Sequence, residues 1–188
     1  DNVFEGELLG QETLQTDTTV RAMIGRIDLS DNRDWDLIGE RIDFDNADSP
    51  TAVAFSPRGD WAFVTAQGNN FVGVFDDLQI RSLESVASKN SKERMGTGLA
   101  PQGIIIDADT ESMWVKNFMD RSVTVFNLSE FLERGSSPTN NTYSTVGTET
   151  LNTSVLNGKQ IFYNASDLGG PNGENRMSLE GYISCATC

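Results

Sequence analysis

The sequence contains no histidine among its 188 residues. Histidine is the usual general base, the usual proton switch near neutral pH and the commonest metal ligand in proteins. Its absence excludes a histidine-dependent catalytic triad within this chain.

Cysteine is also scarce, since the two present, Cys185 and Cys188, stand together at the C-terminal end of the sequence. A disulfide joins residues that are close in space, so this pair cannot cross-link the body of the fold. The body must be stabilised by its hydrophobic core, which a chain of this length is large enough to form.

Long apolar runs are missing as well. No stretch approaches the roughly 18 apolar residues that a membrane-spanning helix requires, so we expect no membrane span. The residues from Asp1 onward lack the basic and apolar regions of a secretory signal peptide, so either none exists or one has been removed.

Basic residues are outnumbered, with 14 against 28 acidic ones and a net charge of −14. Such a surface repels phosphate backbones and anionic lipids, so we expect no nucleic-acid partner. An acidic surface favours basic proteins or cations, but it also keeps exported proteins soluble, and charge alone names no ligand.

What the sequence does contain is an internal repeat with an offset of 51 residues (101 − 50). Each repeated run is short and rich in Val, Ile, Phe and Trp, and residues typical of turns separate the runs. The matched runs are 50–59 with 101–110, 61–66 with 112–117, and 71–76 with 122–127. Three strands are therefore predicted to occur twice, in the same order, as antiparallel meanders.

Weaker matches extend the pattern. Residues 22–29 resemble the third strand of the unit, and residues 36–44 would form a fourth, outer strand. The pattern of residues 78–95 is consistent with either an outer strand or a short helix. We predict a strand followed by a polar loop. A short helix capped by Ser129 and ended by Gly135 is predicted after the second repeat.

A repeated four-stranded unit of this kind resembles a blade of a β-propeller, of the surface-layer, YVTN or quinoprotein amine dehydrogenase type. The resemblance covers residues 20–128. It implies an all-β fold, a partial β-propeller of four-stranded antiparallel blades with two clear repeats and part of another. A plain β-sandwich is the alternative. Because a ring needs at least four blades, the remaining blades or a partner chain would have to close it.

The two cysteines are spaced as Cys185-Ala186-Thr187-Cys188. In covalent haem attachment, two cysteines at this spacing form thioethers with the porphyrin, and the residue after the second is the histidine that ligates iron. Position 189 lies beyond this chain, so that histidine is inferred. The pair could instead be a thioredoxin-like redox pair, a structural disulfide or half of a zinc site.

The residues before the cysteines narrow this choice. Gly158-Lys159-x-x-Phe162-Tyr163, a loop and then residues 177–188 resemble the N-terminal haem domain of bacterial dihaem cytochrome c peroxidases and related methylamine-utilisation enzymes. The resemblance covers residues 158–188 only. It implies a covalent haem c on Cys185 and Cys188, and it assigns no catalytic residue and no metal ligand within this chain.

The predicted domains are propeller blades over residues 1–135, a linker over 136–155, and the incomplete start of a cytochrome c-type haem domain over 156–188. The linker is predicted from its Ser, Thr, Asn and Gly content. Apolar residues at helical spacing predict a helix over residues 156–163, followed by a loop.

Two other features carry weaker signals. Acidic residues crowd the turns at 28–36 and 43–48, which we expect to be solvated loops, with a Ca²⁺ site as the alternative. Trp35, Trp61 and Trp114 are expected in the core or between blades.

Two functions are consistent with these patterns. The first is a fragment of an exported bacterial c-type haem protein, periplasmic or extracellular, that acts in electron transfer or peroxide reduction. Its propeller would be a docking or support domain, and its partner a redox protein or peroxide. The second is a non-enzymatic secreted or cell-surface propeller that binds a protein or glycan, with Cys185 and Cys188 in a local disulfide. A histidine codon after Cys188 would favour the first, and this chain alone is expected to be inactive.

Overall fold

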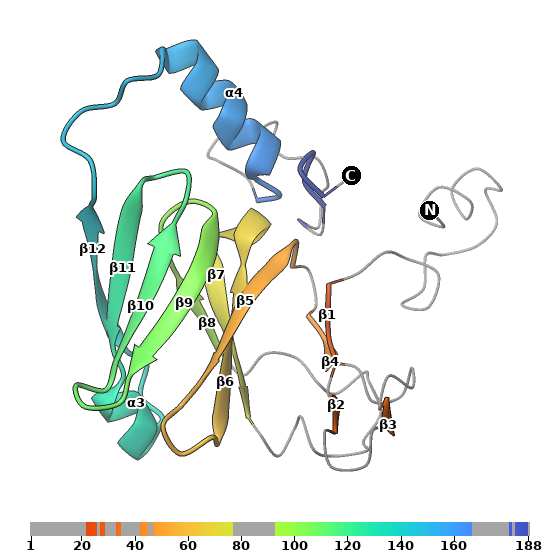
Figure 1. The fold of residues 1–188 in the computed structure, drawn as a ribbon, viewed down its shortest axis with the longest axis vertical. Helices are drawn as coiled ribbons and strands as arrows, with labels where there is room; N and C mark the ends of the chain where they lie inside the picture. Colours follow the sequence, from red (N-terminus) through yellow and green to blue (C-terminus); the bar gives the residue numbers. More distant parts are fainter. Residues whose placement is uncertain are drawn as a thin grey trace, which may run out of the picture.

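The computed structural model describes residues 22–25, 27–28, 33–34, 42–44, 47–76, 93–166, 181 and 183–187. Its centre is a pair of four-stranded antiparallel sheets that lie face to face (Figure 1). The first sheet contains, in spatial order, β5 (Pro50–Phe55), β6 (Trp61–Ala66), β7 (Phe71–Asp76) and β8 (Glu93–Gly96). The second contains β9 (Pro101–Asp107), β10 (Ser112–Asn117), β11 (Ser122–Asn127) and β12 (Thr139–Ser144).

The repeat predicted from the sequence is present in the backbone. β6, β7, β10 and β11 begin and end at the residues that the sequence repeat predicts. Ser49 and Ala100, which are equivalent in the repeat, both have positive φ, at 50° and 54°. Both residues also accept an equivalent hydrogen bond. The Gln67 amide donates to the Ser49 carbonyl at 3.0 Å, and the Phe118 amide donates to the Ala100 carbonyl at 2.9 Å. The two sheets are therefore two copies of one structural unit.

The hydrophobic core lies between the two sheets. In each strand alternate side chains point to one face, as the pleat of a β-strand requires. The buried side chains of this core are Phe63, Val72, Val74 and Met95 from the first sheet and Met113, Val115 and Phe126 from the second. The short helix α3 (Ser129–Arg134) lies at one end of the sheets (Figure 1). Its Phe131 is buried in the same core and packs on Trp61, with ring centroids 5.1 Å apart.

The other face of the first sheet is also covered. Phe44 and Ala47 are buried there, and the Phe44 ring meets the Phe75 ring edge-on with centroids 5.1 Å apart. Just before Phe44 in the chain, β4 (Ile42–Asp43) pairs antiparallel with β1 (Met23–Ile24). This pairing agrees with the third and fourth strands predicted there, although residues 35–41 lie outside the described part of the chain. A second short pair is formed by β2 (Ile27–Asp28) and β3 (Arg33–Asp34).

These sheets form a partial β-propeller of four-stranded antiparallel blades, as predicted. Each blade is built from consecutive strands, and the outer strand β8 connects directly to β9, which lies beside β5 of the first blade. A sandwich of the immunoglobulin type would instead cross between its sheets through Greek-key connections. We call the sheet β5 to β8 the first blade and the sheet β9 to β12 the second blade.

Two outer strands lie where the sequence predicts loops. β8 falls in the segment predicted as a polar loop, and residues 77–92 before it lie outside the described part. β12 falls inside the predicted linker over residues 136–155, and it pairs with β11 along all six residues. All six residues of β12 are exposed, so the strand carries no apolar alternation for sequence analysis to detect. The second blade therefore extends to Ser144, and the boundary of the next domain stays a prediction.

The predicted helix after the second repeat is confirmed as α3, and it ends as predicted at Gly135, whose φ is +70°. The predicted cap is wrong, because Leu128 occupies the N-cap position and provides no side-chain hydrogen bond. Instead the Ser129 amide donates to the side-chain oxygen of Asn127 at 3.0 Å. None of the helices in the described ranges has the length and apolar character that crossing a membrane requires.

The tryptophans are placed differently from one another. Trp61 packs between the two blades, as predicted. Trp114 instead lies on the outward face of the second blade and is exposed, contrary to the expectation of a core or inter-blade position within this chain. Trp35 lies outside the described residues.

Candidate functional site

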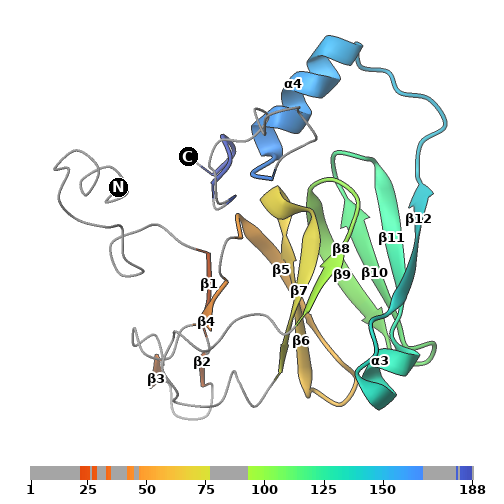
Figure 2. The same ribbon diagram turned by 180° about the vertical axis from the view of Figure 1, so that it is seen from behind.

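The C-terminal segment begins with the helix α4 (Thr153–Tyr163), which confirms the predicted helix and starts three residues before it. The side chain of Asn152 accepts a hydrogen bond from the Ser154 amide at 2.9 Å and so caps the first turn. Both ribbon views place α4 beyond the end of the blades that is opposite to α3 (Figures 1 and 2). The segment that leads to the cysteines is therefore placed at one end of the propeller.

Aromatic and polar contacts hold α4 to the turns of the blades. The rings of Tyr163 and Phe118 meet edge-on with centroids 5.5 Å apart, and the Lys159 ammonium lies 5.5 Å above the Phe118 ring. The Asn70 side chain donates to the Asn164 side chain at 2.8 Å. Phe118 and Asn70 belong to equivalent turns of the two blades, so the helix is anchored on both blades.

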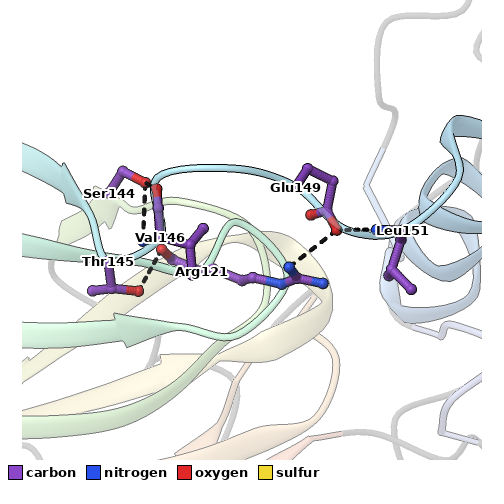
Figure 3. A network of polar contacts seen from close by, with 6 residues as sticks. All are labelled: Arg121, Ser144, Thr145, Val146, Glu149 and Leu151. Atoms are coloured by element: carbon purple, nitrogen blue, oxygen red, sulfur yellow. Dashed lines mark hydrogen bonds and ion pairs between the residues drawn. The ribbon is translucent and has the colours of Figure 1, made fainter.

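The connection between β12 and α4 is held by its own polar network (Figure 3). Arg121 forms an ion pair with Glu149 at 3.0 Å, and the same carboxylate accepts from the Leu151 amide at 2.6 Å. The Thr145 hydroxyl donates to the Arg121 carbonyl at 2.6 Å. The Leu151 amide, and with it the positive charge of Arg121, lowers the pKa of Glu149 below its ordinary value of 4.5. The connector is thereby fixed to the turn that precedes β11.

The turn that contains Cys185 spans residues 183–187 and is docked beside α4. The Ala186 amide donates to the carbonyl of Phe162 at 3.0 Å, which joins the turn to the last turn of the helix. The Thr187 amide donates to the Ser184 carbonyl at 3.2 Å, which closes the turn itself. Phe162 follows Lys159 in the motif that predicts the haem domain. The helix that carries this motif therefore contacts the cysteine turn in the folded chain.

The same turn also contacts the first blade directly. The Thr187 hydroxyl donates to a carboxylate oxygen, Oδ1, of Asp48, and it lies 3.0 Å from the hydroxyl of Ser49. Just before the turn, the Gly181 carbonyl accepts from the side chain of Asn69 at 2.6 Å. Residues that are more than a hundred positions apart in sequence therefore hold the cysteine motif on the propeller.

Asp48 is the central residue of this docking contact. Its side chain is only 1% exposed, and its amide donates to the side-chain oxygen of Asn69 at 2.5 Å. The second carboxylate oxygen, Oδ2, is buried without a hydrogen-bond partner among the described residues. It lies against Gly68, where a Cβ would overlap it. A buried carboxylate is costly unless it is hydrogen-bonded, so the hydrogen bonds that Thr187 and Ser49 donate to Oδ1 are important for its stability.

The burial of Asp48 corrects the expectation that the acidic turn at residues 43–48 is a solvated loop. Within the described ranges, no group of three or more acidic or cysteine side chains is placed to hold a metal ion. Residues 45 and 46 of the turn lie outside those ranges.

Cys185 is a free thiol and is partly exposed at this docked turn. Two neighbouring side chains on α4, Ile161 and Phe162, are also exposed although both are large and apolar. The helix residue Phe162 meets the cysteine turn through its backbone carbonyl, which accepts from the Ala186 amide. Cys188 lies outside the described residues, so the geometry of the second thiol is a prediction.

A crevice between α4 and the blade turns has room for about one water molecule, roughly 10 Å³, and is lined by Asn70, Met119 and Tyr163 among others. A porphyrin or a peptide cannot enter it.

The sequence predicts a site at Cys185 but does not indicate the residues that dock it. Asp48, Asn69 and Thr187 have no motif in common, and only the fold brings them together. The sequence repeat contains one signal for this contact, because it makes Asn69 equivalent to Asp120. The Asn69 side chain accepts from the Asp48 amide, and the Asp120 side chain accepts from the Leu99 amide. Asp48 and Leu99 both lie just before an inner strand. These turns are therefore built to hold the inner strands, and only the first one also holds the cysteine segment.

No protein-family model matches this chain, and no curated protein sequence matches it. A functionally unknown protein from Desulfotomaculum acetoxidans has a similar structure, with 21% identity over 61% of this chain and 32% of that protein and a TM-score of 0.44. The periplasmic gluconolactonase PpgL of Pseudomonas aeruginosa is 19% identical over 54% of this chain and 28% of that protein, with a TM-score of 0.41. The β-propeller domain of Cps50 (Swd1) from Myceliophteria thermophila is 11% identical over 55% of this chain and 34% of that protein, with a TM-score of 0.40. The chain spans about a third of the length of these structures.

Proposed function

We propose that this chain is the propeller portion, with the start of the haem domain, of an exported bacterial c-type haem protein that acts in electron transfer or peroxide reduction. The observation that carries the proposal is the docking of the cysteine turn. The partly exposed Cys185 is held beside α4 and on the first blade by hydrogen bonds of Ala186 and Thr187. A mobile tail would need no such support, whereas a prosthetic group that exchanges electrons must be held in a fixed position.

The residues present fit covalent haem in three respects. Cys185 and Cys188 would provide the two thioether bonds, and the small Ala186 between them leaves space for the porphyrin plane to approach the backbone. The exposed Ile161 and Phe162 would be covered by the apolar face of the ring. This chain has no histidine, so the histidine that would ligate iron must come from outside it. The haem, when bound, would supply the one-electron chemistry.

The propeller residues have a supporting part in this proposal. Asp48, Ser49 and Asn69 hold the attachment turn, and Phe118 and Asn70 hold α4. The haem domain would then keep a fixed orientation to the blades. The rest of the propeller surface, which carries most of the net charge of −14, would be free to meet a basic redox partner by electrostatic steering. A periplasmic or extracellular location follows from the proposed haem type.

The first test is the codon after Cys188 in the gene, which should encode histidine. The encoded polypeptide, expressed in a bacterial periplasm together with a haem-attachment system, should retain haem absorbance after denaturation and removal of free haem. Peptide mass spectrometry of this site should find one thioether in Cys185→Ala and none in Cys185→Ala with Cys188→Ala. Thr150→Ala, in the exposed connector, is the matched control and should keep full haem.

The proposal is refuted if the wild-type polypeptide is folded and exported but carries no covalent haem. A codon other than histidine after Cys188 would have the same meaning. Either result would favour a propeller that binds a protein or glycan and closes its two cysteines into a disulfide.

A further inference from the structure

The outward face of the second blade is largely apolar, and no described residue covers it. Ile105 is 66% exposed, Trp114 is 44% exposed and Tyr143 is 58% exposed. Val123 and Val125 lie between them and are half-buried. Trp114 faces Val125 and Ile105 across the neighbouring strands, and Tyr143 faces Val123. These five side chains form one continuous surface, which we call the outward face.

The repeat identifies what this face is equivalent to. At an offset of 51 residues, Trp114 corresponds to Phe63, and Val123 and Val125 correspond to Val72 and Val74. Tyr143 corresponds to Met95, because each is paired with the equivalent valine of the third strand, Val123 and Val72. The four equivalents in the first blade, Phe63, Val72, Val74 and Met95, are 0 to 4% exposed.

The first-blade equivalents are buried because a neighbouring blade covers them. Met113, Val115 and Phe126 of the second blade provide that cover in the core between the blades. Apart from Lys116, which stands where the first blade has the buried Thr65, the outward face of the second blade therefore has the composition and geometry of a blade-to-blade interface, with no blade against it among the described residues.

We propose that the outward face is the docking surface for a further four-stranded blade of the same polypeptide and ring, and that this blade presents apolar side chains in the pattern of Met113, Val115 and Phe126. After β12 the chain runs to α4, which lies at the end of the blades rather than across the outward face (Figure 1).

A second copy of the chain is the competing occupant, and charge argues against it. Each copy carries a net charge of −14, so two copies would repel each other as they approach. If two copies packed through their outward faces, the exposed Lys116 of each copy would lie in the same interface, and these two positive charges would repel each other. A blade of the same polypeptide brings no second set of these charges.

The structure shows where a test blade can be inserted. The Thr97 amide donates to the Asn70 carbonyl at 2.9 Å, and the Thr145 amide donates to the Arg121 carbonyl at 2.8 Å. Asn70 and Arg121 are equivalent in the repeat, and both have positive φ. Thr97 and Thr145 therefore stand at equivalent places just after the outer strand. A copy of residues 97–144 inserted between Ser144 and Thr145 continues the ring by one blade with the native connection.

The experiment compares the chain with and without this inserted blade, by hydroxyl-radical footprinting and mass spectrometry. The inserted copy carries Trp114→Phe and Tyr143→Phe, so that only the original side chains are read. Oxidation of the original Trp114 and Tyr143 should fall several-fold in the extended chain. An insertion that also carries Met113→Lys and Val115→Lys in the copy should give no protection. Unchanged oxidation of Trp114 in a folded extended chain would overturn the proposal.

Two measurements on the chain itself complete the test. Sedimentation velocity should show a monomer, whereas a discrete dimer that Trp114→Lys dissociates would make a second copy the occupant and overturn the proposal. Trp114→Ser should leave the free energy of unfolding nearly unchanged, whereas Phe63→Ser should unfold the chain. An equal loss in both variants would mean that Trp114 is already covered within this chain, and it would also overturn the proposal.

Discussion

The replacement Thr187→Val tests whether the cysteine turn is held on the first blade. It removes the hydroxyl that contacts Asp48 and Ser49 but keeps the size and branching of the side chain. The Ala186 amide, which donates to the Phe162 carbonyl at 3.0 Å, reports on the docked state. If the turn detaches from the blade more often, this amide exchanges with solvent more often.

The size of the effect follows from the contact that is lost. A hydrogen bond to a charged group contributes about 1.5–3 kcal/mol, and the lower end applies here because Thr187 is exposed although Asp48 is buried. A loss of about 1.5 kcal/mol raises the population of the detached turn about tenfold, since about 1.4 kcal/mol corresponds to one factor of ten. Exchange of the Ala186 amide should accelerate by the same factor under conditions where reclosing is fast.

The assay is hydrogen–deuterium exchange by NMR or by mass spectrometry of the C-terminal peptide. Thr110→Val is a matched control, because it also removes a threonine hydroxyl that donates to an aspartate, Asp107, at 2.8 Å, but on an exposed turn of the second blade. It should leave exchange of Ala186 unchanged. If Thr187→Val also leaves that exchange unchanged, the Asp48 contact adds nothing to the attachment of the turn on α4, and the claim that the first blade holds the attachment site fails.

Three further predictions concern the packing and the connector. Gly68→Ala should destabilise the fold by about 1–3 kcal/mol, because the new Cβ would overlap the buried Oδ2 of Asp48. Gly96→Ala is the control and should cost much less, because Gly96 has open space around it. Denaturant unfolding measures the free energy of unfolding of both variants. Phe131→Ala should cost about 3–5 kcal/mol in the same assay, because it removes a buried ring from the core between the blades, and a loss below about 1 kcal/mol would contradict that placement. Glu149 has a lowered pKa in the folded state, so its contribution to holding the connector is fully present above pH 4.5 and is lost as the pH falls through its folded pKa. NMR shifts of the connector amides against pH should show this transition in wild type, and Glu149→Gln should abolish it.

The strands of the blade interiors could be predicted from sequence because each is a local pattern. Short apolar runs between turn residues define β6, β7, β10 and β11, and the 51-residue offset supports each assignment with its counterpart. The outer strand β12 could not be predicted, because all six of its residues are exposed. Its pairing with β11 depends on backbone hydrogen bonds, which leave no trace in side-chain composition.

The candidate site divides in the same way. The spacing of Cys185 and Cys188 and the Gly158-Lys159 motif before them are local, so the sequence alone identifies the attachment segment and the repeat unit of the propeller. Only the tertiary structure places that segment against Asp48 and uncovers the face around Trp114. The physical reason is that docking and burial join residues far apart in the chain, 139 positions in the case of Asp48 and Thr187. No local pattern encodes such a contact, because its stability depends on how the blades pack.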